Sequence, residues 1–186
     1  MWEKDLYKTS KKIRVIKMIT FKKLEDTEDN YLKLYKWCSK KHVYEWFEQR
    51  ILSLEEIENK YKNKLEENKQ ELLIIECDNT DIGLVQIYKF ENDINLNITY
   101  NNIYEYDLFI GEEDYLDKGI GQQVINQINE MIYSKYNADA IILRPFKRNV
   151  RAISCYKKCN FKILTEYNGF DTLNNPEIIS ILISTK

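Results

Sequence analysis

Two short patterns in the C-terminal half of this chain, separated by one helix and one strand, constrain its fold more than any other feature. The first is the pair Gly119 and Gly121, which opens an amphipathic segment whose apolar residues recur at helical spacing. A short apolar run at 138–143 then predicts a buried strand. The second pattern lies on a further predicted helix and reads Asn149-x-x-Ala152-x-x-x-Tyr156. This order of elements is typical of a mixed α/β fold.

Hydrophobic periodicity predicts the elements around these patterns. One helix is expected where Tyr31, Leu34, Tyr35 and Cys38 recur, and another after Ser53, which begins a capping box. The turn-forming residues at 78–81 predict a hairpin. Strands are expected over 13–19, 72–77, 82–90, 103–110, 161–167 and 178–183. The resulting order, β-α-α-β-β-β-α-β-α-β-β, predicts a single domain over 1–186 with a mixed, mostly antiparallel sheet flanked by helices.

The predicted strand over 103–110 has two unlike faces, because successive side chains of a strand point to opposite sides. One face carries Tyr104, Tyr106, Leu108 and Ile110. The other carries Glu105, Asp107 and Phe109. Asp107 is therefore expected on the more polar face of the strand.

Charge and composition exclude several classes of protein. A net charge of −2 and a pI of about 5.7 give no electrostatic case for binding nucleic acid. No apolar run approaches the roughly 18 residues of a membrane span, and the N-terminal segment lacks the features of a signal peptide. A cytoplasmic protein with no membrane partner is therefore expected. Its four cysteines are expected to stay reduced, and no metal site is expected, since His42 lies far from them in sequence.

The segment Lys118-Gly119-Ile120-Gly121 has the chemistry of a phosphate cradle. The first turn of a helix leaves backbone N–H groups without partners, and the helix dipole favours an anion there. Glycine allows the backbone to approach a ligand closely, and Lys118 adds a positive charge. The alternative is an ordinary glycine turn before a helix.

Both patterns together resemble the acetyl-CoA site of the GNAT N-acetyltransferases, and the order of elements is that of the GNAT fold. The resemblance implies that Asn149 binds the cofactor arm, that Ala152 allows a close approach, and that Tyr156 protonates the departing thiolate. The residues that the resemblance assigns to cofactor binding are Phe109, Ile110, Lys118, Gly119, Ile120, Gly121, Gln122, Asn149, Ala152 and Tyr156. Backbone N–H groups of the strand over 103–110 would polarise the thioester carbonyl.

A closer resemblance, over roughly residues 30–165, is to the aminoglycoside 6′-N-acetyltransferases. It rests on Tyr106-Asp107-Leu108-Phe109-Ile110-Gly111-Glu112, on the glycine loop, and on the tryptophan and acidic residues upstream. It implies that Asp107 faces the acceptor amine, which it would bind and deprotonate. The residues assigned to the acceptor are Glu45, Trp46, Glu105 and Asp107, with Glu48, Glu112 and Asp171 as further acidic candidates, and Trp37 and Tyr44 as further aromatic ones.

Four positions depart from the family pattern: Leu108, Leu116, Arg144 and Asn160. Arg144 stands where aspartate is usual, and Asn160 stands where glycine is usual. These departures weaken the assignment of the acceptor and leave open whether specificity or activity differs from that of the subgroup.

The predicted function is direct transfer of an acetyl group from acetyl-CoA to a primary amine, with the 6′-amine of an aminoglycoside as the leading acceptor. The predicted partner is thus a small, polycationic amine, and the chain is expected to be a monomer or a homodimer. Other acceptors remain open: a polyamine, a siderophore precursor, streptothricin or a peptide. A non-catalytic acyl-CoA-binding protein of the same fold is the alternative from a different class.

Overall fold

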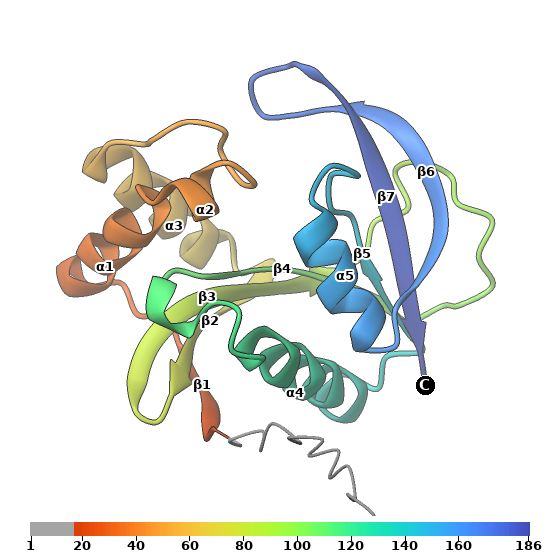
Figure 1. Cartoon of the computed structure of the whole chain (residues 1–186), viewed down its shortest axis with the longest axis horizontal. Helices are drawn as coiled ribbons and strands as arrows, with labels where there is room; N and C mark the ends of the chain where they lie inside the picture. The colour runs from red at the N-terminus through yellow and green to blue at the C-terminus, as the bar shows by residue number, and fades with distance from the viewer. Residues whose placement is uncertain (1–16) are drawn as a thin grey trace, which may run out of the picture.

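A seven-stranded sheet organises the computed structural model, which describes residues 17–186 (Figure 1). In spatial order its strands are β1 (Ile19–Lys23), β2 (Gln70–Cys77), β3 (Thr80–Lys89), β4 (Ile103–Ile110), β5 (Ala140–Leu143), β7 (Pro176–Thr185) and β6 (Lys162–Phe170). Only β4 and β5 pair in parallel. The predicted mixed, mostly antiparallel sheet is confirmed. Of the strand expected at 13–19, residues 13–16 lie outside the described residues, and the described strand begins at Ile19.

Helices cover both faces of the sheet (Figure 1). The helices α1 (Glu28–Cys38), α2 (Lys41–Tyr44) and α3 (Leu54–Glu67) lie on one face, and α4 (Ile120–Lys135) and α5 (Val150–Lys158) on the other. The short α2 and the 3₁₀ turn η1 (Glu113–Tyr115) were not expected from the sequence. Within residues 17–186, no helix is both long enough and apolar enough to span a bilayer.

Local sequence explains where these elements begin and turn. Thr27 caps α1 by accepting a hydrogen bond from the Asn30 backbone N–H. Ser53 and Glu56 form the predicted capping box at the start of α3. Asp78 and Asn79 both have positive φ, the conformation of a two-residue turn, and they join β2 to β3 as the predicted hairpin.

The alternation along β4 divides the core. Tyr106 packs in a cluster with α4 and α5, whereas Phe109 packs with α1 and α3. Asp107 shares the face of Phe109, as the sequence pattern predicted. Gly111 follows the strand where Trp37 approaches, and a Cβ atom built there would lie 2.2 Å from the Trp37 ring. Only glycine therefore fits at this position.

A gap opens in the sheet between β4 and β5. Their pairing joins only Ile103 to Ala140, Tyr104 to Ile141, and Glu105 to Ile142. Beyond these pairs β4 continues to Ile110 with β3 as its partner, while β5 ends at Leu143. From Tyr106 onward, the side of β4 that would face β5 is therefore left open.

Candidate active site

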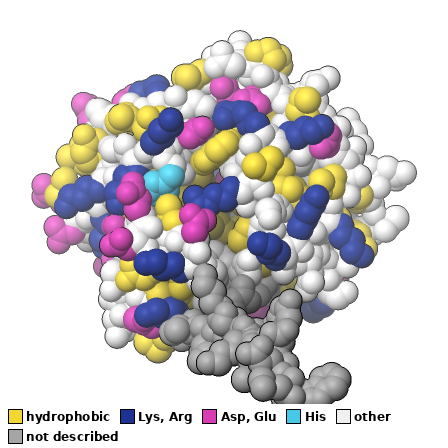
Figure 2. All heavy atoms as spheres, viewed as in Figure 1, with side chains coloured by type: hydrophobic (Ala, Val, Ile, Leu, Met, Phe, Trp, Pro, Cys, Tyr) yellow, Lys and Arg dark blue, Asp and Glu magenta, His cyan; other side chains and the backbone are white. Residues whose placement is uncertain are grey.

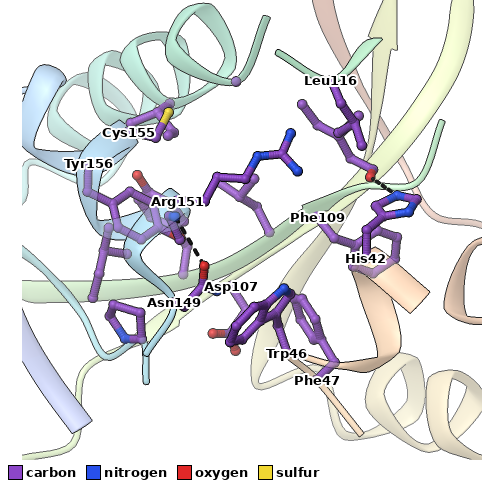
Figure 3. A pocket seen from close by; sticks show the side chains of 18 of the residues that line it. His42, Trp46, Phe47, Asp107, Phe109, Leu116, Asn149, Arg151, Cys155 and Tyr156 are labelled. Carbon is purple, nitrogen blue, oxygen red and sulfur yellow. Dashed lines mark hydrogen bonds between the residues drawn. The ribbon is translucent and has the colours of Figure 1, made fainter. Parts of the chain in front are cut away.

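A pocket of about 630 Å³ fills this gap and is lined from both faces of the sheet (Figure 3). The residues here called the α5 side are Gly119, Gly121, Gln122, Asn149, Ala152, Cys155 and Tyr156. The residues here called the α3 side are Trp46, Glu48, Lys60, Lys64, Gln86, Asp107 and Arg144. Phe109 and Ile110 line the pocket between them. Most residues that the resemblance assigned to a site are thus brought together in one cavity.

The glycine loop forms the N-terminus of α4. Gly119 is the N-cap residue with φ of 78°, a left-handed conformation that favours glycine, and no side chain caps the helix. The N–H groups of the first turn therefore lack side-chain partners. A Cβ atom at Gly121 would lie 3.6 Å from the Cys155 sulfur, so larger side chains there would enter the pocket. Two predicted contacts do not line the pocket: Lys118 is exposed, and Ile120 is buried in the core.

Asn149 is the N-cap residue of α5. Its side-chain oxygen accepts a hydrogen bond from the backbone N–H of Ala152 at 3.1 Å, drawn as a dashed line in Figure 3. This oxygen thus holds the helix start, and the amide NH₂ group is the part of Asn149 that remains to donate to a ligand. Asn160, just after the helix, has φ of 68°. Asparagine tolerates this left-handed conformation, which explains why it replaces the glycine usual at that position.

Tyr156 points from α5 into the pocket. Its ring packs edge-on against Phe161, with the ring centroids 5.9 Å apart. Burial, followed by the negative charge of Asp107, raises the pKa of Tyr156 above its ordinary value of 10.0. The hydroxyl group is therefore protonated at neutral pH and able to donate a proton or a hydrogen bond.

Asp107 lines the pocket. Its side chain is accessible from the cavity, while the protein packed around the cavity partly desolvates the carboxylate. The Tyr88 hydroxyl donates to its Oδ2 at 2.9 Å. Burial raises the pKa of Asp107, while the Tyr88 hydrogen bond and the positive charge of Lys64 oppose the rise. A carboxylate with a raised pKa is a stronger base than one at the ordinary pKa.

Glu105 was predicted to contact the acceptor, but the structure places its side chain outside the pocket lining. It is 3% exposed, does not line the pocket, and pairs with Arg144 through two hydrogen bonds, Nε to Oε1 at 2.7 Å and NH2 to Oε2 at 2.8 Å. Arg144 also bonds Asp93 at 3.0 and 3.2 Å. The arginine therefore stands in the pocket wall with its charge compensated by two carboxylates.

Of the other acidic and aromatic residues that were predicted to contact the acceptor, some line the pocket and others do not. Trp46 and Glu48 line the pocket, but Glu45 and Tyr44 do not. Trp37 is buried beneath Gly111 and donates through its indole N–H to Glu112 at 2.6 Å, so both have structural contacts. Asp171 closes the β6–β7 turn by accepting from the Leu173 and Asn175 backbone N–H groups.

Arg148 and Arg151 occupy different parts of the molecule. The Arg148 guanidinium lies 4.9 Å from the Trp46 ring centroid, at the edge of the α3 side, and pairs with Glu177. Arg151 lines the pocket and pairs with Asp117 at 3.1 Å, beside the glycine loop. Of the two, only Arg151 is placed to meet a phosphate group near α4.

Sequence reasoning missed several residues of the pocket, including His42, Lys60, Lys64 and Gln86. The Nε2 atom of His42 lies at hydrogen-bond distance, 3.1 Å, from the carbonyl oxygen of Ile110, which can only accept (Figure 3). The two lysines lie one helical turn apart, next to the buried Tyr61. That spacing was a visible signal that both reach the same side of α3.

The family of the chain follows from a match to the family model for an acetyltransferase (GNAT) domain, which covers residues 26–168. This is most of the chain, and the chain belongs to the GNAT acetyltransferase family. The expected class of enzyme and its fold are thereby confirmed.

Individual relatives are more distant. The aminoglycoside N(6′)-acetyltransferase type 1 of Klebsiella pneumoniae is 24% identical over an alignment of 147 residues that covers 73% of this chain and 71% of that protein. The spermidine N(1)-acetyltransferase of Vibrio cholerae is 26% identical over 117 residues, which are 62% of this chain and 63% of that protein. A structure of aminoglycoside acetyltransferase AAC(6')-Ib in complex with coenzyme A shares the fold, with a TM-score of 0.76 at 20% identity over 91% of this chain and 95% of that one.

Proposed function

We propose that this protein transfers an acetyl group from acetyl-CoA to a primary amine directly, in a ternary complex. The observation that carries the proposal is the single pocket that joins Asp107, Tyr156 and the N-terminus of α4 through the gap between β4 and β5. A base, an acid and a phosphate-binding helix end therefore face one cavity.

The α5 side has the features needed to hold the arm and phosphates of acetyl-CoA. The first turn of α4 presents backbone N–H groups, Gly121 keeps side-chain atoms out of the cleft, and Arg151 adds a positive charge. When bound, acetyl-CoA supplies the thioester whose acetyl group is transferred. Backbone N–H groups on the open side of β4 are available to polarise the thioester carbonyl.

Asp107 would bind the acceptor as an ammonium ion and then accept a proton from it, directly or through water. Asp107 releases this proton to water, and the neutral nitrogen forms the new C–N bond as the C–S bond breaks. Asp107 then accepts the second proton, which the nitrogen loses as it becomes an amide. Tyr156 would donate its hydroxyl proton to the leaving sulfur, which departs as a thiol. Since the two residues stand on opposite sides of the gap, one deprotonates the nucleophile while the other protonates the leaving group.

The acceptor hypothesis that the sequence resemblance supports is the 6′-amine of an aminoglycoside. The aminoglycoside relative and the motif around Asp107 support it, and the spermidine acetyltransferase relative supports a polyamine in the same way. Both hypotheses rest on likeness at or below 26% identity. Both hypotheses have transfer to a primary amine in common, and the pocket geometry supports this common reaction.

Release of free CoA from acetyl-CoA, measured with a panel of amines, tests the proposal. The panel pairs an aminoglycoside that bears a 6′-amine with its 6′-hydroxyl counterpart, and adds spermidine, streptothricin and short amines. Turnover with any amine supports the reaction, and turnover with the 6′-amine alone supports the aminoglycoside. Binding of acetyl-CoA with no turnover on any amine would refute the proposed reaction and favour a non-catalytic acyl-CoA-binding protein.

A further inference from the structure

Lys64 lines the pocket and carries a positive charge that no carboxylate of the described residues holds in an ion pair. It projects from α3, where its Nζ donates to the Oε1 of Gln86 and lies 5.9 Å from the Tyr61 ring centroid. Lys60, one turn earlier, differs because it forms an ion pair with Glu48. Among residues 17–186, Lys64 forms no ion pair.

Gln86 holds Lys64 on a fixed side of the pocket. The glutamine is 3% exposed, and it stands directly opposite Asp107 in the register of β3 and β4. Directly opposed residues on an antiparallel pair have neighbouring side chains. Lys64 and Asp107 therefore lie on the same side of the sheet, with Gln86 beside both. No ion pair involves Asp107 in the described part of the chain, although the two charges attract one another.

The other charges of the α3 side are already compensated. Glu48 pairs with Lys60, and Arg144 pairs with Glu105 and Asp93. One cation, Lys64, and one anion, Asp107, thus remain for a ligand. Figure 2 likewise shows basic and acidic side chains interspersed over the face viewed in Figure 1, with no acidic patch.

This arrangement suits a polycation poorly. A second ammonium group on the acceptor would meet the positive charge of Lys64. The carboxylates that line this side, Glu48 and Asp107, would already be engaged with Lys60 and with the reacting amine. Like charges at this range repel, and a partly buried site screens them less than water does. An amine that also carries a negative charge would satisfy both Asp107 and Lys64.

We infer that Lys64 binds a negatively charged group of the acceptor, most simply a carboxylate, while Asp107 binds its amine. The inference rests on the proposed function and narrows its acceptor to amino acids with a free terminal amine, in place of the polycations that the relatives suggest. Burial, followed by the charge of Lys60, lowers the pKa of Lys64, and the charge of Asp107 opposes this change. A negative group of a bound ligand beside Lys64 would favour the charged form in the same way as Asp107 does.

Matched acceptors of equal chain length test this inference. The first pair is 4-aminobutyrate and 1,4-diaminobutane, and the second is 5-aminopentanoate and 1,5-diaminopentane. Within each pair, only the group distant from the reacting amine changes charge. Affinity is measured by calorimetry in the presence of CoA, and kcat/KM is measured by CoA release. We expect the amino acid of each pair to bind about tenfold or more tightly than the diamine, the scale of one charge-assisted hydrogen bond.

Variants of Lys64 then test whether this residue causes the preference for the amino acid over the diamine. Lys64→Gln should reduce it by about tenfold, mainly through KM, and Lys64→Glu should reverse it in favour of the diamine. Lys64→Arg keeps the charge and should keep the preference. Lys62→Gln is the matched control, because Lys62 lies on the exposed side of the same helix and should leave the preference unchanged.

The outcomes separate the inference from the function on which it rests. Turnover of diamines or aminoglycosides in preference to amino acids, with no effect of Lys64→Gln, would overturn the inference and leave amine acetylation standing. Failure of every amino acid to bind would also overturn it. Binding of amino acids that depends on Lys64, without acetyl transfer to any amine, would support the inference and refute the proposed reaction.

Discussion

Removal of Arg144 should destabilise the protein through Glu105, and the loss should grow with pH. Glu105 is 3% exposed, and its two hydrogen bonds from Arg144 are the contacts that compensate its charge. In the unchanged protein the Arg144 guanidinium lies 5.7 Å from the centroid of the Phe90 ring. Arg144→Met removes the positive charge and keeps an apolar side chain against that ring. The carboxylate would then be buried without a partner.

The size of the loss follows from the burial of this pair. Breaking a buried ion pair by removing one partner costs about 3–5 kcal/mol of unfolding free energy. The second partner of Arg144, Asp93, has a side chain that is 58% exposed, so that pair adds at most about 1 kcal/mol. We therefore expect Arg144→Met to lose about 3–5 kcal/mol at pH 8.

The pH dependence has a definite sign. Burial raises the pKa of Glu105 from its ordinary value of 4.5 to about 7, although Arg144 opposes the rise. Without Arg144 this pKa rises further. A carboxyl group with a higher pKa in the folded state takes up a proton on folding, so stability increases as the pH falls from above the folded value toward 4.5. The variant should thus lose less at pH 5.5 than at pH 8.

Urea unfolding at pH 5.5 and pH 8 measures both effects. Glu105→Gln combined with Arg144→Met removes both charges, and this double variant should recover most of the stability lost at pH 8. An equal loss at the two pH values, or no recovery in the double variant, would show that Arg144 acts through packing and not through the charge of Glu105.

Four further predictions concern the pocket. Asp107→Asn should lower kcat by about 10²–10⁴-fold with acetyl-CoA affinity unchanged by calorimetry. In the unchanged protein, kcat/KM should rise with pH through a pKa above the ordinary aspartate value of 3.8, since the base acts only when deprotonated. Tyr156→Phe should cost less, roughly tenfold in kcat, because water can also protonate the thiolate, and an unchanged rate at every pH would reduce Tyr156 to packing. Gly121→Val should raise KM for acetyl-CoA by roughly tenfold with little change in Tm, since a Cβ atom fits 3.6 Å from the Cys155 sulfur but its branches enter the cleft. Unchanged KM would place the cofactor elsewhere.

Most of the fold was predictable because its signals are local. The capping box at Ser53, the positive-φ turn at Asp78 and Asn79, and the alternation along β4 each need only a few neighbouring residues to be recognised. The helix α2 was missed for the same reason, since four residues hold too little of a helical period to stand out. The limits of the β4–β5 pairing depend on contacts across the sheet and leave no local pattern.

The α5 side of the pocket was also predictable, because two continuous motifs supply it. Gly119, Gly121, Asn149, Ala152 and Tyr156 all line the cavity, as the resemblance implied. Lys118 and Ile120, also predicted to bind the cofactor, do not line the cavity, because their side chains turn to solvent and to the core where the helix begins. The direction of a side chain within a tight loop depends on dihedral angles that the sequence does not specify.

The α3 side was less predictable because its charges come from segments far apart in the chain. From the sequence, Arg144 is a cation that replaces a usual aspartate, and Glu105 is an acceptor-binding acid. In the structure, Arg144 in the pocket wall forms an ion pair with Glu105 behind it, so each compensates the charge of the other. The cation of the α3 side that is left without an ion pair among the described residues is Lys64, which lies on a helix outside the sequence motifs. It bonds Gln86, the residue paired with Asp107 across β3 and β4. In this protein the sequence motifs therefore support the cofactor and the reaction. The choice of acceptor depends instead on which pocket charges are left without an ion-pair partner, and this can be read only from the folded structure.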